Sequence, residues 1–193
     1  TLADVLKSQS AVRVANNSGN SYQSILSIRG FGDNAQANSL ILVDGFPLIN
    51  SSLLAPNFNA ILLSDIQKID LFQGSQGSLW GNQAVGGVMN IETLHPQKPV
   101  GNLTVSYGSY NTPYVSGLYG DKLENGIFYK VSGFATTTDN AREHNRQTDG
   151  GMALQEGFDY ATGTITLNQK IYDDTTHFPG GLTKAQFESD PSQ

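Results

Sequence analysis

The chain has 193 residues, a formal charge of −6 and no cysteine. Its 21 glycines and its 15% of charged residues are typical of a turn-rich β protein rather than a helical bundle. An acidic chain without a basic run argues against a phosphate-binding surface, so we expect no nucleic-acid partner. The absence of cysteine excludes disulfides, thiolate zinc sites and cysteine nucleophiles. No stretch approaches the roughly 18 to 20 consecutive apolar residues of a membrane-spanning helix, whereas the short alternating strands of a transmembrane β-barrel are allowed.

The first half of the chain contains short apolar segments separated by turn residues. Leu2, Val5 and Leu6 have helical spacing and predict a short opening helix. The apolar runs at 25–28 and 40–43 predict buried strands, each of which ends at a glycine turn. This half therefore reads as a compact α/β module with many turns.

Two further strands are predicted later in the same module, at 69–72 and 88–93, where polar and apolar residues alternate. Ser64 and Asp65 can start a short helical turn ahead of the first of them. Glycine in the connecting turns permits a positive φ or a close approach of two backbones. The turn positions that we single out are Gly30, Asp44, Gly45, Gly74, Gly81, Gly86 and Gly87.

The second half has a longer two-residue periodicity. Leu103, Val105 and Tyr107 alternate with small polar residues, which predicts strands with one apolar and one small polar face. The predicted strands are residues 101–108, 115–119, 127–135 and 161–168. Residues 137–157 are charged and poor in apolar side chains and predict a solvated loop, and 172–193 predicts another. The pattern indicates an antiparallel meander with unpaired edges.

No arrangement of residues indicates catalysis or metal binding. The sequence contains no Gly-x-Ser-x-Gly motif, and the glycine-rich segment 74–81 lacks the Gly-Lys-Ser/Thr ending of a phosphate-binding loop. His95, His144 and His177 are far apart and have no partner at the spacing of a metal site, so we interpret them as loop residues. We therefore predict no enzyme activity, no metal site and no cofactor.

Four segments of the first half match, in order, the motifs of one known family. They are residues 2–6 (LADVL), 27–32 (SIRGFG), 42–48 (LVDGFPL) and 66–91 (IQKIDLFQGSQGSLWGNQAVGGVMNI). Through them the chain resembles the TonB-dependent outer-membrane receptors. The resemblance implies a mainly β fold, in which an α+β plug with short helices precedes the antiparallel strands of an incomplete transmembrane β-barrel. The implied domains are a plug at 1–97 and the N-terminal strands and loops of the barrel at 98–193.

The resemblance also implies a location and a function. The protein is expected in the bacterial outer membrane, with its plug within the barrel and the base of the plug facing the periplasm. Its expected partners are TonB, a ferric siderophore or similar small ligand, and the membrane. Haem, cobalamin, nickel, a sugar or another vitamin remain possible ligands. The family's barrels have 22 strands, so we expect a fragment that also lacks the TonB-contacting segment ahead of Leu2.

Specific residues take roles from the same resemblance. Arg29 and Asp70 are expected to seat the plug against the barrel, in an ionic cluster that Gln73 weakens because the family usually has a basic residue there. The ligand should contact polar loops at the outer apex of the plug. The ligand-facing candidates are Phe31, Asp33, Asn34, Asn50, Ser51, Trp80, Asn82 and Gln83.

One alternative of another class remains open on the residues alone. A soluble β-rich interaction domain or carbohydrate-binding domain would show the same alternation. In that case Val105, Tyr107, Val115 and Tyr119 would pack in the core of a sandwich instead of facing lipid.

Overall fold

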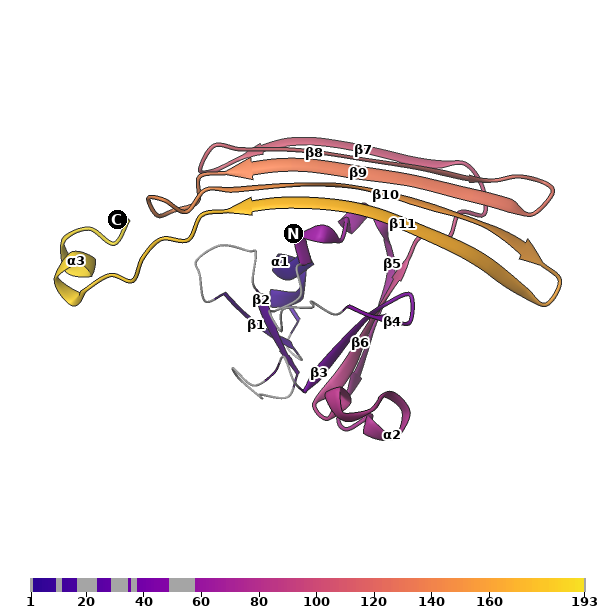
Figure 1. The fold of residues 1–193 in the computed structure, drawn as a ribbon, viewed down its shortest axis with the longest axis horizontal. Helices are drawn as coiled ribbons and strands as arrows, with labels where there is room; N and C mark the ends of the chain where they lie inside the picture. Colours follow the sequence, from indigo (N-terminus) through magenta and orange to yellow (C-terminus); the bar gives the residue numbers. More distant parts are fainter. Residues whose placement is uncertain are drawn as a thin grey trace. The chain divides into compact units, whose positions relative to one another are not determined.

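The computed structural model describes residues 2–9, 12–16, 24–28, 35, 38–48 and 58–192 (Figure 1). The chain divides into two compact units, Thr1–Leu94 and His95–Gln193. Within these described ranges, no helix has the length and apolar character needed to cross a membrane.

The first unit combines short strands with short helices (Figure 1). Its strands are β1 (Val12–Asn16), β2 (Ser24–Ile28), β3 (Ser39–Val43), β4 (Phe46–Pro47), β5 (Ile66–Gln73) and β6 (Gly87–Thr93). Its helical segments are α1 (Leu2–Lys7), η2 (Phe58–Ala60), η3 (Leu63–Asp65), α2 (Gly77–Trp80) and η4 (Asn82–Ala84). β1 pairs with β2, and a four-stranded sheet has the order β4-β3-β6-β5, in which only the β3–β6 pair is parallel. The predicted opening helix and the strands at 25–28, 40–43, 69–72 and 88–93 are confirmed.

Strand β6 lies at the centre of this unit and is buried on both faces. Met89 and Ile91 are fully buried in the main core cluster, which also contains Leu2, Leu6 and Ile28. On the opposite face, the side chain of Val88 packs in a second cluster (Leu40, Leu42, Ala84 and Val88). Burial of each large apolar side chain contributes about 1.5–3 kcal/mol. A strand with neighbours on both edges and both faces therefore holds the unit together.

Gly87 begins this strand at a point where the backbone is crowded. A Cβ atom on Gly87 would lie 2.6 Å from the Phe72 carbonyl oxygen and 3.0 Å from Ile28 Cγ2, and its φ is +154°. β6 can approach β5 and β2 this closely because the residue has no side chain. Gly77 in α2 offers a contrast, since the nearest atom to an added Cβ is Ser75 Oγ at 3.8 Å.

The second unit is one antiparallel sheet of five long strands, the wall (Figure 1). Its strands are β7 (Val100–Gly108), β8 (Thr112–Lys122), β9 (Ile127–Thr138), β10 (Gln147–Tyr160) and β11 (Gly163–Thr176), followed by helix α3 (Lys184–Ser189). The strand order β11-β10-β9-β8-β7 is a meander in which each strand pairs with the next in sequence. The predicted meander is confirmed.

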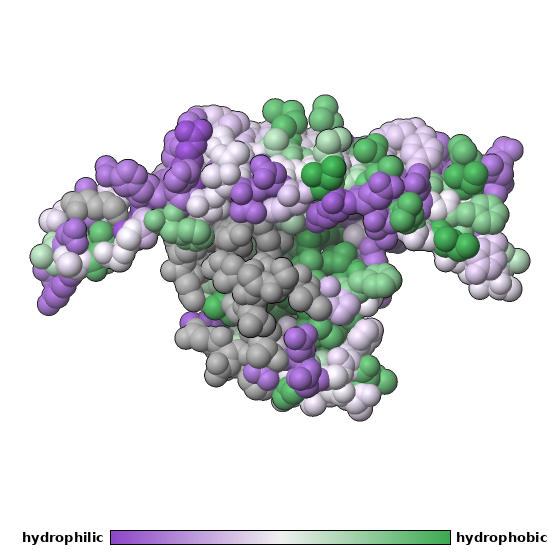
Figure 2. Space-filling model, in the orientation of Figure 1, coloured by the Kyte–Doolittle hydropathy of each residue, from purple (hydrophilic) through white to green (hydrophobic). Residues whose placement is uncertain are grey.

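The two faces of the wall differ in polarity. One row of paired residues crosses all five strands: Val105, Val115, Ala135, Gly150 and Asp173. Side chains alternate between the two faces of a strand, so residues at even spacings from this row lie on the same face as the row. That face exposes apolar side chains, and Figure 2 shows hydrophobic residues, in green, projecting along the long strands. They include Leu103, Val105, Tyr107, Val115, Tyr119, Val131, Met152, Phe158, Ile165, Leu167 and Ile171.

The alternative of a soluble sandwich core is wrong for these side chains. Val105 is 75% exposed, Tyr107 71%, Tyr119 46% and Val115 43%. They lie on the open face of a single sheet rather than between two sheets.

Two sequence-based loop predictions are also wrong. β10 occupies most of the predicted loop 137–157, because pairing with β9 on one edge and β11 on the other holds its charged and glycine residues in a strand. In the predicted loop 172–193, β11 continues to Thr176 and α3 forms downstream. The Thr183 hydroxyl accepts a hydrogen bond from Gln186 N, and Gln186 Oε1 accepts one from Thr183 N, which makes a capping box.

We predict that Gly87→Ala destabilises the first unit, whereas Gly77→Ala does not. The added methyl group at residue 87 must displace backbone, and we expect a loss of about 1–3 kcal/mol in the free energy of unfolding. At residue 77 there is room in a helical turn, and we expect a change within about 0.5 kcal/mol. The measurement is the urea midpoint of the full-length protein, followed by hydrogen exchange in peptides covering β3 and β6. Equal midpoints for the two variants would refute the crowding argument.

Candidate functional site

The predicted turn at Asp44 and Gly45 fastens the β3–β4 connection to the end of β6. Both residues have positive φ, 51° and 81° respectively. Asp44 Oδ1 accepts a hydrogen bond from Thr93 N at 2.7 Å, and Asp44 Oδ2 accepts one from Thr93 Oγ1 at 2.8 Å. Asp44 N also donates to the Ile91 carbonyl oxygen at 2.8 Å, and Gly45 N donates to Asn90 Oδ1 at 3.2 Å. The turn therefore holds the last strand of the first unit at its C-terminal end.

Residues 74–86 form an excursion between β5 and β6, and its base is closed by backbone hydrogen bonds. Gly74 N donates to Gly86 O at 3.2 Å, and Gln76 N donates to Ala84 O at 2.8 Å. Gly86 N donates to Asn38 O at 2.7 Å, which ties the excursion to the residue ahead of β3. Gly74 and Gly81 have φ of 95° and 82°, a region that favours glycine. The predicted turn glycines of this segment thus lie in one connected loop.

The excursion displays a group of candidate ligand-facing residues together. Trp80, Asn82 and Gln83 all lie on α2 and η4 and are exposed, with Trp80 42% exposed. Leu79 beside them is 78% exposed, whereas Ala84 is fully buried in the cluster under the loop. Residues 74–86 contain no ionisable side chain. The surface can therefore stack on an aromatic group and exchange amide hydrogen bonds, but it cannot make an ion pair.

Asp70 lies on β5, where it is bound within its own strand. Lys68 Nζ lies 2.7 Å from Asp70 Oδ2, and the two side chains share a face because they are two residues apart. The hydrogen bond and the negative charge of Asp70 raise the pKa of Lys68 above its usual value. The role of Asp70 in seating the plug stays a prediction.

The remaining predicted site residues lie outside the residues that the structure describes. They are Arg29, Gly30, Phe31, Asp33, Asn34, Asn50 and Ser51. Their assignment rests on the sequence alone and stays a prediction.

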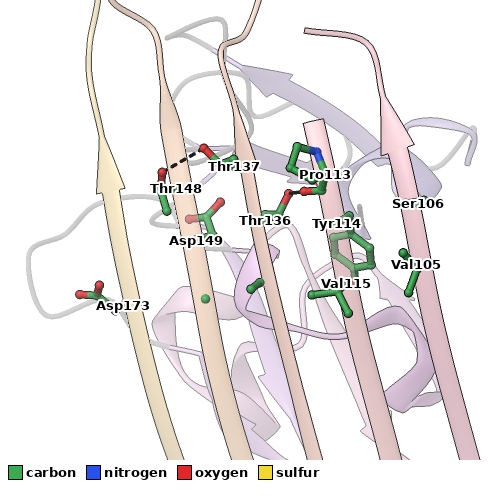
Figure 3. Close-up of a pocket in the computed structure, with 12 residues that line it drawn as sticks. Val105, Ser106, Pro113, Tyr114, Val115, Thr136, Thr137, Thr148, Asp149 and Asp173 are labelled. Carbon is green, nitrogen blue, oxygen red and sulfur yellow. Dashed lines mark hydrogen bonds between the residues drawn. The ribbon is translucent and has the colours of Figure 1, made fainter. Parts of the chain in front are cut away.

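The wall contains a hollow of about 550 Å³ along the row defined above (Figure 3). Ala135 and Gly150 are the small residues of that row, and Thr137 Oγ1 lies 3.1 Å from Thr148 Oγ1 near one end of the hollow. Its lining includes apolar residues such as Val105 and Val115 as well as polar ones such as Asp149 and Asp173. In the described part of the chain, no group of three or more His, Cys, Asp or Glu side chains is arranged to hold a metal ion.

Sequence comparisons identify the first unit. The model of the TonB-dependent receptor plug domain matches residues 1–88. The vitamin B12 transporter BtuB of Vibrio vulnificus is 30% identical over 168 residues, which cover 87% of this chain and 24% of that protein. The pesticin receptor of Yersinia enterocolitica is 35% identical over 83 residues, covering 42% of this chain and 11% of that receptor.

Solved structures show the same fold across both units. The siderophore receptor PirA from Acinetobacter baumannii superposes with a TM-score of 0.70 at 20% identity, covering 91% of this chain and 29% of that one. The copper transporter OprC gives a TM-score of 0.74 at 19% identity, covering 93% of this chain and 29% of that one.

A plug-domain match followed by a wall of antiparallel strands defines a class of outer-membrane receptors and transporters, not of enzymes. The chain belongs to the TonB-dependent receptors of the outer membrane. Its fold is a mainly β plug followed by the strands of a partial barrel. The chain spans about a quarter of the length of BtuB, the first of the relatives above.

Sequence reasoning missed the interaction between Asp44 and Thr93. The motif around Asp44 predicted a turn, but the two residues are 49 positions apart and no local pattern links them. Only the pairing of β3 with β6 brings them together.

We predict that Asp44→Ala lowers the stability of the first unit by about 1 kcal/mol, because it removes two hydrogen bonds to a charged acceptor that is partly in water. Thr93→Val should cost less, because the backbone bond to Asp44 remains. The measurement is a double-mutant cycle on urea midpoints of the full-length protein. Gln73→Ala, a change at an exposed side chain on β5, serves as the control. Additive effects of the changes at residues 44 and 93 would contradict the direct contact.

Proposed function

We propose that the chain is part of a ligand-gated importer that moves a scarce small ligand across the outer membrane with energy transduced by TonB. The most favoured ligand is a ferric siderophore. The observation that carries the proposal is the plug-domain match at residues 1–88, followed directly in sequence by a wall with an exposed apolar face. We keep the division into a plug at 1–97 and barrel strands at 98–193 as part of this proposal.

The wall supports a place in the membrane on physical grounds. Its strands have 9 to 14 residues, whereas a transmembrane β-strand needs about 9–11. Leu103, Val105 and Ile171 are 75–78% exposed. Transfer of such apolar side chains from water into lipid is favourable. Tyr107 and Tyr160 lie near opposite strand ends, where aromatic residues mark the interfaces of barrel walls.

The plug is the proposed gate, lying within the barrel with its base toward the periplasm. The ligand would bind above it, on the exposed excursion with Trp80, Asn82 and Gln83 and on the loops that carry Phe31 and Asn50. The remaining contact candidates are Asp33, Asn34 and Ser51, and the proposed seating pair is Arg29 with Asp70. Binding can signal occupancy only if the ligand favours one state of the plug over another. No bond chemistry is needed.

The names of the relatives indicate which ligand classes to test first. PirA is a siderophore receptor, BtuB a vitamin B12 transporter and OprC a copper transporter. An uncharged excursion with one tryptophan suits a ligand with flat or aromatic groups, which many iron chelates contain. Iron chelates are therefore the first ligands to test, and cobalamin and copper are the next.

We predict that uptake depends on both the protein and TonB. Cells carrying or lacking the full-length gene, with and without a working tonB, are grown under iron limitation and supplied with radiolabelled iron bound to the organism's own secreted siderophores. Import should fall to background in both defective strains. Parallel assays with radiolabelled cyanocobalamin and copper separate the ligand classes. Unchanged uptake of all three would refute import of these ligands and would make haem, nickel and sugars the next ligands to test.

We predict that Trp80→Ala weakens ligand uptake without loss of folded protein. Removing an exposed stacking group costs about 1–1.5 kcal/mol of binding, so the half-saturating concentration should rise roughly tenfold. The matched control is Phe46→Ala, because Phe46 is an aromatic residue that is 72% exposed but lies on β4, outside the excursion. Equal half-saturation for both variants and the wild type would exclude Trp80 from the ligand site.

A further inference from the structure

The segment that joins the plug to the wall contains two prolines, Pro96 and Pro99. Leu94, the last residue of the first unit, donates its N–H to the Asp65 carbonyl oxygen at 2.7 Å. His95, the next residue, belongs to the second unit and is bound there through its side chain. Each of these adjacent residues is thus held by its own unit.

The carboxylate of Asp159, in the wall, binds the segment that follows Leu94. Asp159 Oδ2 lies 3.1 Å from His95 Nε2 and 2.7 Å from Lys122 Nζ. Thr164 Oγ1 donates to Asp159 Oδ1 at 2.6 Å, and Asp159 N donates to Gly126 O at 2.9 Å. The Asp159 side chain is only 20% exposed. It therefore connects the segment to both turns at one end of the wall, the β8–β9 turn and the β10–β11 turn.

His95, Pro96 and Gln97 make further contacts with the wall around Asp159. The His95 ring meets the buried ring of Phe128 edge-on, with the centroids 4.2 Å apart. Pro96 is fully buried over Gly120, where an added Cβ would lie 2.7 Å from Pro96 Cγ. Lys122 Nζ, already bound to the carboxylate, also donates to Gln97 Oε1 at 2.9 Å. Three successive residues, His95, Pro96 and Gln97, are therefore attached to the wall.

We propose that residues 95–97 are a clamp that stays closed during gating and makes this end of the plug its fixed end. The clamp combines charge-assisted hydrogen bonds, an aromatic contact and a buried proline, all on the wall side of Leu94. In this proposal a force on the plug opens contacts within the plug while the clamp stays closed. The moving part ends at Leu94, and a plug that leaves its place must do so by rearranging its own strands.

The role in gating rests on the proposed function, but the clamp can be tested without transport. The 193 residues contain no cysteine, so Lys98→Cys introduces one labelling position in this part of the chain for a nitroxide spin label, next to the clamp. In the purified full-length protein we expect an immobilised spectrum.

Asp159→Asn should shorten the rotational correlation time of the label several-fold, and Thr164→Val, which keeps the charge, should have a smaller effect. Asp173→Asn removes a carboxylate from β11 outside the cluster and should leave the spectrum unchanged. Identical spectra for Asp159→Asn and the wild type, with circular dichroism showing both folded, would overturn the clamp.

A cross-link tests whether the clamp stays closed. An added Cβ at Gly120 would lie 2.7 Å from Pro96 Cγ, so this pair of positions is the one at which we test a disulfide. Pro96→Cys with Gly120→Cys should form a bond, verified by loss of maleimide labelling, and the oxidised protein should import radiolabelled ferric siderophore at the wild-type rate. Import that stops on oxidation and returns with a reductant would overturn the fixed end. Absence of TonB-dependent uptake in the wild type would instead count against the proposed function, and the spin-label result would still decide whether the clamp exists.

Discussion

The two-sided burial of β6 is the constraint on which the first unit depends. This strand has neighbours on both edges and apolar clusters on both faces, and the excursion that precedes it and the Asp44 turn that holds its end are both fixed to it. Gly87 allows the strand to approach β2 and β5 closely enough to close that core. The exposed surface around Trp80 can therefore be carried by a short loop and still keep its shape, because the base of the loop is part of the core.

The wall is stabilised differently from the plug. Its five strands gain hydrogen bonds along every shared edge, but one face keeps large apolar side chains outside any core. In water such a face is an open hydrophobic surface of a kind that soluble monomers rarely expose. A lipid environment removes this cost without a second layer of protein on that face.

Much of the fold could be predicted from the sequence, and the failures have a common cause. Short periodic signals located α1, β3 and β6, and the glycine-rich motif identified the plug. β10 was missed because its strand state comes from pairing on two edges rather than from its own charged composition. The Asp44–Thr93 and His95–Asp159 contacts were missed because they join residues 49 and 64 positions apart. Local patterns report the periodicity of an element, but they do not report which elements meet.

The proposed gating needs one end of the plug that moves and one that does not, and the hydrogen bonds on the two sides of residue 94 differ in their shielding from water. On the plug side, Thr93 at the end of the final strand donates its backbone N–H and its hydroxyl to the exposed carboxylate of Asp44, and Leu94 N donates to Asp65 O. On the wall side, a largely buried carboxylate collects three side-chain donors next to a buried proline. Exposed hydrogen bonds exchange with water at little cost, whereas a satisfied and shielded cluster does not. This difference in shielding, more than the number of bonds, is the basis of the proposal that rearrangement begins in the plug and stops at the wall.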